Sequence, residues 1–381
     1  MKETRAVLQI ATVISLTVLP PTTGIAQSGV DRCVNEGKKF SSDQQIDGCT
    51  AAIQSGKWRG KELSWAYNNR GNAYRDGKKD SDRGIADYTK AIELDPRNSF
   101  PYNGRGNAYR DKKDYDRALA DYNKAIELNP KYANPHNGRG NIYRDKKDND
   151  RALAEFNKAI ELDPKLVDPY NGRGNVYRDK KDYDRAIADY IRAIELNPKY
   201  ALPYNGRGNV YGDKKDYDRA IADFSKAIEL DPNYATAYNN RGQAYENKKD
   251  YDRAIADYSK AIDLQPNNAG YFNNRCWSRA IAGRDLPQAL GDCDESLRLK
   301  PNDANTIDSR GLVYLRLDRL KDAIAEYDTA LKLDPKIATS LYGRGIAKQR
   351  NGDTDGGKTD IEAAKVINAD VADDFASYGV K

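Results

Sequence analysis

Residues 133–166 read ANPHNGRGNIYRDKKDNDRALAEFNKAIELDPKL, and close copies of this stretch fill most of the chain. A proline stands at place 32, counted from the first residue of the stretch. Prolines recur with a period of 34 residues, except for one interval of 35 before Pro301. They are Pro96, Pro130, Pro164, Pro198, Pro232, Pro266, Pro301 and Pro335. A fixed period of this length indicates stacked structural repeats rather than a single globular core.

Each copy contains two apolar patterns with the spacing of an α-helix. Places 4, 8 and 11 fall on one helix face, and places 20, 24, 27 and 28 fall on another. In the quoted stretch these places include His136, Gly140, Tyr143, Ala152, Phe156 and Ala159. Small residues at places 8, 20 and 27 let the two helices approach, and the proline at place 32 stops the second helix. The pattern therefore predicts an all-α chain of helix–turn–helix units.

The small residue at place 8, Tyr at 11, Ala at 20, an aromatic at 24 and Pro at 32 resemble the tetratricopeptide repeat (TPR) family, here in an exported bacterial form. The resemblance implies a right-handed superhelical solenoid of stacked helix–turn–helix units that binds other proteins. It covers nine repeats over residues 64–371, of which the ninth is degenerate because Gly357 and Ile361 replace the usual residues at places 20 and 24. Residues 27–63 are predicted to form a degenerate leading repeat, and residues 372–381 a C-terminal capping segment.

The N-terminus has the organisation of a secretory signal peptide. Lys2 and Arg5 precede an apolar run over residues 6–19, and small residues lead to a cleavage site after Ala26. A retained anchor is the alternative, but the run is shorter than the roughly 20 residues that span a bilayer. We therefore expect residues 1–26 to be removed and the mature chain to be periplasmic or secreted, without membrane insertion.

Four cysteines occupy equivalent places in two repeats. Cys276 and Cys293 stand at places 8 and 24 of the seventh repeat, and Cys33 and Cys49 have the separation that these two places require. In an exported chain such pairs predict two disulfides that join the helices of one repeat. The alternative is four buried thiols. A zinc site is not expected, because its ligands would be more closely spaced and would include histidine.

Catalytic, cofactor, metal and nucleic-acid sites are not expected in this chain. The single histidine, His136, stands at place 4, where neighbouring repeats carry tyrosine, so that it is interpreted as a core residue. No Ser/His/Asp or Cys/His set can be assembled. The formal charge of +5 is spread over 63 basic and 58 acidic residues, without the basic stripe of a nucleic-acid-binding protein.

Arginine at place 7 and an acid at place 23 recur in all nine repeats, as in Arg173 and Asp189. Leucine is usual at place 7 in the family. Because both places lie on the inward side of their helices, we expect an arginine–acid ladder between helices that fixes register. The alternative is a row of arginines for anionic ligands.

In the TPR family the first helix of each repeat (helix A) lines a concave binding face through places 5, 9, 12 and 13. In this chain places 5 and 9 carry asparagine and place 12 arginine. The predicted peptide-binding residues are Asn103, Asn107, Asn137, Asn141, Asn171, Asn175, Asn205, Asn209, Arg110, Arg144 and Arg178. An asparagine amide suits the N–H and C=O groups of an extended peptide, whatever its side chains. The alternative is that asparagine only keeps helix A soluble.

From the seventh repeat onward the binding face becomes apolar, through Trp277, Leu312, Leu315 and Ile346. Such a patch is expected to be covered. Residues 370–381, with Val371, Phe375 and Tyr378, are predicted to cap it, and a partner's anchoring pocket is the alternative. The sequence thus favours a non-enzymatic adaptor that binds protein or extended peptide in the bacterial envelope. A structural assembly scaffold, and an accessory factor for envelope polysaccharide export or modification, are the other hypotheses.

Overall fold

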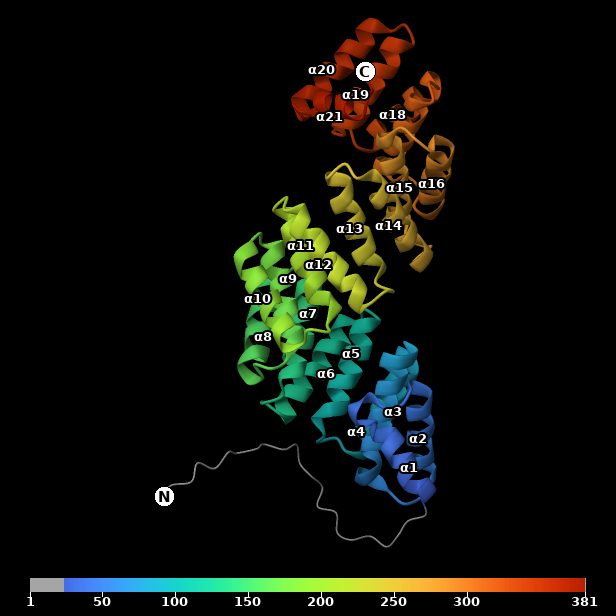
Figure 1. The fold of residues 1–381 in the computed structure, drawn as a ribbon. Coiled ribbons are helices and arrows are strands. Elements are labelled where there is room, and N and C mark those ends of the chain that lie inside the picture. Colours follow the sequence, from blue (N-terminus) through green and yellow to red (C-terminus); the bar gives the residue numbers. More distant parts are fainter. Residues whose placement is uncertain (1–23, 381) are drawn as a thin grey trace. The chain divides into compact units, whose positions relative to one another are not determined.

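The computed structural model describes residues 24–380, which form helices α1 to α21 and contain no strand (Figure 1). Residues 1–23, most of the predicted signal peptide, lie outside the described residues, so its cleavage stays a prediction. The chain forms two compact units that divide in the sequence between Gly172 and Arg173, within α9 (Val167–Asp179).

The first unit is a series of antiparallel helix pairs, each packed on the next. Its helices are α1 (Gly24–Val34), α2 (Ser42–Gln54), α3 (Ser64–Asn72), α4 (Ser81–Leu94), α5 (Ser99–Asp111), α6 (Tyr115–Leu128), α7 (Ala133–Asp145) and α8 (Asn149–Leu162). Short 3-10 turns at Glu36–Lys38 and Gly60–Leu63 flank α2. A π-helical turn at Ala73–Gly77 continues α3, and such a turn takes up the one extra residue of the first repeat.

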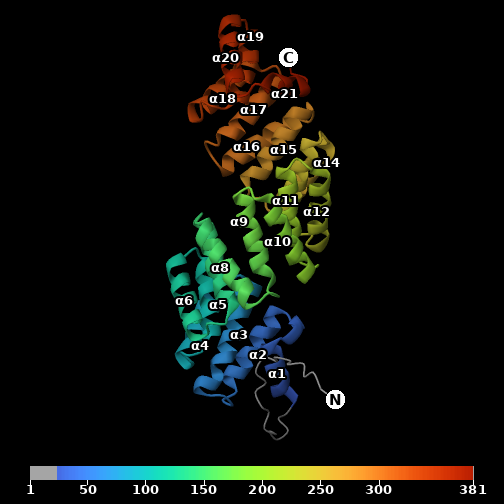
Figure 2. The same ribbon diagram turned by 90° about the vertical axis from the view of Figure 1, so that its left-hand side faces the viewer.

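The second unit repeats the same arrangement (Figure 2). Its helices are α10 (Tyr183–Leu196), α11 (Ala201–Asp213), α12 (Tyr217–Leu230), α13 (Ala235–Asn247), α14 (Tyr251–Leu264), α15 (Ala269–Ala282), α16 (Leu286–Leu299), α17 (Ala304–Arg316), α18 (Leu320–Leu333), α19 (Ala338–Arg350), α20 (Thr354–Ile367) and α21 (Val371–Ser377). The extra residue of the seventh repeat lengthens α15 and is followed by a left-handed Gly283.

The Lys-Lys-Asp turn between the two helices of a repeat has one recurring local structure. In the third repeat Lys147 is left-handed, with φ of 60°, and directs the chain back. The side chain of Asp148 then accepts a hydrogen bond from the N–H of Arg151 at 3.1 Å and caps the second helix (helix B). The same aspartate cap is present at Asp80, Asp114, Asp182, Asp216 and Asp250.

The core of each repeat is built around the ring at place 24. Tyr122 is fully buried between helix A of its own repeat and helix A of the next. A Cβ added at Gly106 (place 8) would lie 2.8 Å from a Tyr122 ring carbon, and one at Gly138 (place 6 of the next repeat) would also collide with this ring. Glycine on both sides is therefore what allows the helices to close on the ring.

The predicted cysteine pairs are bonded in the structure, as Cys33–Cys49 and Cys276–Cys293, with S–S distances of 2.03 and 1.99 Å. Each disulfide joins the two helices of one pair, α1 to α2 and α15 to α16. The leading pair α1/α2 also takes part in the repeat-to-repeat contacts, because Thr50 Oγ1 accepts a hydrogen bond from Arg70 at 3.1 Å.

Helix α21 covers the apolar face at the C-terminal end of the second unit. Its residues Val371 and Phe375 belong to one core cluster with Leu312, Leu315 and Ile346, of which the latter three are 1%, 1% and 5% exposed. In addition, Arg316 donates hydrogen bonds to the carbonyl oxygens of Ile281, at 2.9 Å, and of Tyr378. Of the four predicted patch residues only Trp277 keeps a partly exposed side chain, and its ring meets that of Tyr378 edge-on at 5.8 Å.

Candidate functional site

The arginine–acid ladder is present in all nine repeats of residues 64–371. Arg105 shows the geometry: its Nε and Nη2 donate to the two carboxylate oxygens of Asp121 at 2.8 Å each, and its Nη1 donates to Thr89 of the preceding repeat at 3.1 Å. The pairs are Arg70–Asp87, Arg105–Asp121, Arg139–Glu155, Arg173–Asp189, Arg207–Asp223, Arg241–Asp257, Arg275–Asp292, Arg310–Glu326 and Arg344–Asp360.

These ion pairs are internal, and their acids are largely buried; Asp121 is 6% exposed. The bond to Asp121 is also the main reason that the pKa of Arg105 is raised. The ladder hypothesis is therefore confirmed, and the place-7 arginines are not a free row for anionic ligands. His136 joins one pair, since its Nδ1 lies 2.8 Å from a carboxylate oxygen of Glu155.

The asparagines at place 9 serve the core of their own repeats. The buried hydroxyl of Tyr122 donates to Asn107 Oδ1 at 2.7 Å, and the same bond joins Tyr88 to Asn72 and Tyr190 to Asn175. Each of these amides therefore has its acceptor occupied from within. Where the ring is phenylalanine, the asparagine bonds elsewhere, as Asn141 does to the carbonyl oxygen of Asn137 at 3.0 Å.

The asparagines at place 5 behave differently in the first unit. The Oδ1 atoms of Asn103, Asn137 and Asn171 are buried and accept no hydrogen bond from the described protein. Asn103 is 8% exposed as a residue, whereas Asn137 and Asn171 are partly exposed residues whose Oδ1 atoms are themselves covered. A buried acceptor without a donor is costly, and here it recurs at the same place of three successive repeats.

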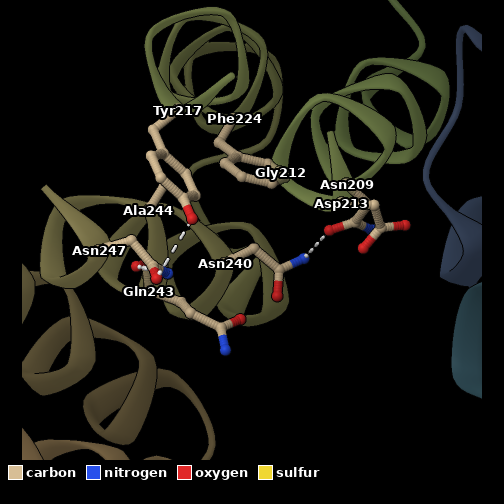
Figure 3. A pocket seen from close by; sticks show the side chains of 9 residues that line it. All are labelled: Asn209, Gly212, Asp213, Tyr217, Phe224, Asn240, Gln243, Ala244 and Asn247. Carbon is tan, nitrogen blue, oxygen red and sulfur yellow. Dashed lines mark hydrogen bonds between the residues drawn. The ribbon is translucent and has the colours of Figure 1, made fainter. Parts of the chain in front are cut away.

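In the second unit, asparagines at place 6 occupy most of these acceptors. Asn240 Nδ2 donates to Asn205 Oδ1 at 3.1 Å and to Asn209 Oδ1 at 3.0 Å, and Asn274 donates to Asn239 at 2.8 Å. Figure 3 shows Asn240 directed at Asn209 beside a hollow of about 180 Å³. The predicted asparagine ladder is thus an internal network here. The exception is Asn273, whose Oδ1 has no partner. The repeat that follows Asn273 carries serine at place 6.

Glycine replaces asparagine at place 6 in the second to fifth repeats, as Gly104, Gly138, Gly172 and Gly206. The acceptor of the preceding place-5 asparagine consequently has no internal donor within the first unit, at Asn103 and Asn137. An asparagine at place 6 of the next repeat therefore occupies the place-5 acceptor, whereas glycine, or the serine that follows Asn273, leaves it without a partner.

Comparison with known proteins agrees with this repeat structure. Models described as TPR repeat match residues 106–143, 140–177, 174–215, 208–249 and 311–352, and models described as tetratricopeptide repeat match residues 66–98, 87–120 and 235–268. The chain belongs to the tetratricopeptide repeat family. Members of this family are generally non-catalytic scaffolds, which supports a protein-interaction adaptor or scaffold.

Among solved structures, this TPR chain is similar to the Cut9–Hcn1 hetero-tetramer of APC/C, with a TM-score of 0.56 and 13% identity over 93% of this chain and 87% of that one. It is 31% identical to YrrB, described as a TPR protein with an unusual peptide-binding site, over 47% of this chain and 92% of that one, with a TM-score of 0.36. PilF of Pseudomonas aeruginosa is 20% identical over 55% of this chain and 94% of that one, with a TM-score of 0.49. The comparison with curated proteins finds no match.

The arginines at place 12 of the TPR chain pair with the aspartates that follow them in sequence. Arg110 and Arg144 each contact the aspartate that follows them, at 3.4 and 3.2 Å. Arg178 lies 3.8 Å from Asp179. Pairs of this kind, with partners that are substantially exposed, contribute little to stability and leave the guanidinium free to exchange partners.

Two polar features of the second unit were not predicted. The place-6 asparagines escaped notice because their partners stand 35 residues away in sequence. The buried carboxyl of Glu246, whose pKa burial raises to about 7, was overlooked because place 12 carries arginine only up to Arg178 and varies in the later repeats. Within residues 24–380 no helix is long and apolar enough to cross a membrane, and no group of three metal-ligating side chains is present.

Proposed function

We propose that this TPR protein is a non-enzymatic adaptor of the bacterial envelope that binds extended polypeptide along the first unit. The contacts would be made by the place-5 asparagines Asn103, Asn137 and Asn171, which form the open wall. The observation that supports this proposal is that their buried carbonyl oxygens accept no internal hydrogen bond. On binding, each of these side chains would turn its amide toward the bound chain, whose backbone N–H would supply the missing donor.

The proposal assigns different roles to asparagines that look alike in sequence. Place-9 residues such as Asn107 contribute mainly by fixing the buried tyrosine, so that their acceptors are not offered to the ligand. Arg110 and Arg144 stand beside the open wall and are weakly paired, and we assign them contacts to peptide carbonyl or carboxylate oxygens. The internally bonded Asn205 is assigned a structural role.

Localisation in the envelope is part of the same proposal. It is supported by the two disulfides, because such bonds persist in oxidising compartments. It is also supported by the signal-like segment before the fold. A fusion of alkaline phosphatase after residue 63, compared with one that lacks residues 1–26, tests it. Activity that depends on residues 1–26 is expected, and equal inactivity of both fusions would refute export.

Peptide binding is tested by selecting ligands from a library of random extended peptides and measuring their affinity by fluorescence anisotropy. The variant carries Asn103→Ala, Asn137→Ala and Asn171→Ala. Asn123→Ala serves as the control, because Asn123 is exposed in the same unit and makes no hydrogen bond. We expect the triple variant to lose about tenfold or more in affinity and the control to be unchanged. Equal binding by all three proteins would remove the open wall as the site.

A further inference from the structure

The second unit contains a pocket of about 350 Å³ formed by the end of α13, the start of α14, α15 and the C-terminal helix α21. The residues that matter here are Glu246, Tyr251, Trp277, Asp373, Asp374 and Tyr378. Figure 2 shows α21 close to α15 and α17, in agreement with the core cluster that these helices share. The pocket exists only because α21 folds back onto the repeats.

Three aromatic side chains line the pocket. The rings of Trp277 and Tyr378 meet edge-on at 5.8 Å, and Tyr251 stands beside them. All three are partly exposed, so that ring surface remains open to a ligand. An aromatic cage of this composition attracts cations through the negative faces of the rings.

A carboxylate with spare hydrogen-bonding capacity lies at the same place. Glu246 accepts hydrogen bonds from Ser278 Oγ and from Tyr258 Oη, at 3.4 Å for the latter, and both reach the same oxygen, Oε2. No described residue donates to its Oε1. Desolvation raises the pKa of this carboxyl to about 7, which shows that the free protein does not fully compensate its charge.

The surrounding charge is predominantly negative. Asp373 and Asp374 project from α21 at the rim, and Lys249, in the turn before α14, is the only cationic residue that lines the pocket. The other titratable groups that face Glu246 are the tyrosines 251, 258 and 378, and the pKa of each is raised, so that they remain neutral. Aromatic faces, two rim carboxylates and one poorly compensated internal carboxylate together favour a positively charged guest.

We propose that this pocket, formed by Glu246, the three rings and α21, binds an alkylammonium group. The carrier is either a free amine or the lysine side chain of a polypeptide, since the two present the same chemistry. All of the lining residues belong to the second unit, so the inference is independent of the open wall of the first.

The inference is tested by calorimetric titration of the purified full chain, at low salt and pH 8, with pentane-1,5-diamine and with Nα-acetyl-lysine methylamide. Nα-acetyl-norleucine methylamide, which keeps the four-carbon side chain and lacks the ammonium group, is the uncharged probe. Glu246→Gln and Trp277→Leu remove the carboxylate and the largest ring. Glu229→Gln is the matched control, because Glu229 is exposed and pairs only with Lys226.

We expect at least one of the two amines to bind, and both substitutions in the pocket to weaken that binding by about tenfold or more, with Glu229→Gln unchanged. Binding by the lysine derivative alone identifies a polypeptide side chain, and binding by the diamine alone identifies a free amine. In the wild type the affinity should fall from pH 8 to pH 6, as Glu246 becomes protonated, and Glu246→Gln should lose this dependence. Failure of both amines to bind, or equal binding of the norleucine probe, overturns the inference. At pH 8 Glu246→Gln should unfold cooperatively and at no lower temperature than the wild type, so that weaker amine binding cannot be ascribed to loss of the fold.

Discussion

Replacing Tyr327 with phenylalanine is expected to stabilise the protein, whereas the same substitution at Tyr122 is expected to destabilise it. Both rings stand at place 24 and are fully buried. The Tyr122 hydroxyl donates a hydrogen bond to Asn107, at place 9 of the same repeat, at 2.7 Å. The eighth repeat carries Leu312 at place 9, and the Tyr327 hydroxyl has no partner. The chemistry removed is identical, and only the partner differs.

The magnitudes follow from the two environments. A satisfied hydrogen bond contributes about 1 kcal/mol net, so Tyr122→Phe should lower the free energy of unfolding by about that amount. A buried hydroxyl without a partner costs about 1–3 kcal/mol, so Tyr327→Phe should raise it by about 1–2 kcal/mol after some loss of packing. The two substitutions should therefore change the free energy of unfolding in opposite directions, with a difference of about 2–3 kcal/mol between them.

Native-state hydrogen exchange is the appropriate assay, because repeat proteins can unfold in parts and a single melting curve averages over them. Protection of the amides of α6 should fall in Tyr122→Phe, and protection of those of α18 should rise in Tyr327→Phe. Urea unfolding of each variant provides a second measure. A loss of stability in both variants would show that place-9 asparagines do not decide whether the hydroxyl is satisfied, and would refute the reasoning.

Three further predictions concern charge and covalent linkage. Because the pKa of Glu246 is raised to about 7, the folded state keeps a proton that the unfolded chain loses near pH 4.5. Glu246 therefore lowers the stability of the fold as pH rises between these values. In urea titrations at pH 5 and pH 8, Glu246→Gln should remove about 2 kcal/mol of this pH dependence, and an unchanged dependence would contradict the pKa shift. Arg207→Met should lower the free energy of unfolding by about 3–5 kcal/mol, because it leaves Asp223 buried without its partner. Adding Asp223→Leu should restore much of this stability. A double variant as unstable as the single one would contradict this account of the ladder. Replacing Cys276 and Cys293 with alanine should lower stability by about 3 kcal/mol for a separation of 17 residues. A double variant as stable as the oxidised wild type would show that the bond is absent from the protein.

The arrangement of helices was predictable because every local signal in a repeat points the same way. The first residues of the predicted repeats, from Ser64 to Ala338, are those at which helix A begins in the structure. The arginine–acid pairs were also predictable, since places 7 and 23 must face each other once two helices pack antiparallel. Periodicity alone fixes these features.

The polar contacts across repeats were not predictable in the same way. Whether the acceptor of an asparagine is occupied depends on a neighbour 31 or 35 residues away, as Asn205 and Asn209 depend on Asn240. The use of Asn107 by Tyr122 depends on side-chain direction within the core and not on sequence spacing. The pocket at Glu246 depends on where α21 docks, which no repeat pattern specifies.

The account's central claim is that the open wall of the first unit binds the backbone of an extended polypeptide. An N-methyl scan of one selected peptide tests this claim directly, because each step removes a single backbone N–H and keeps the side chains. We predict that methylation at a few separate positions weakens binding by about tenfold each, and that these losses disappear in the variant lacking Asn103, Asn137 and Asn171. Uniform tolerance of N-methylation, with affinity set by the peptide's side chains alone, would contradict the claim.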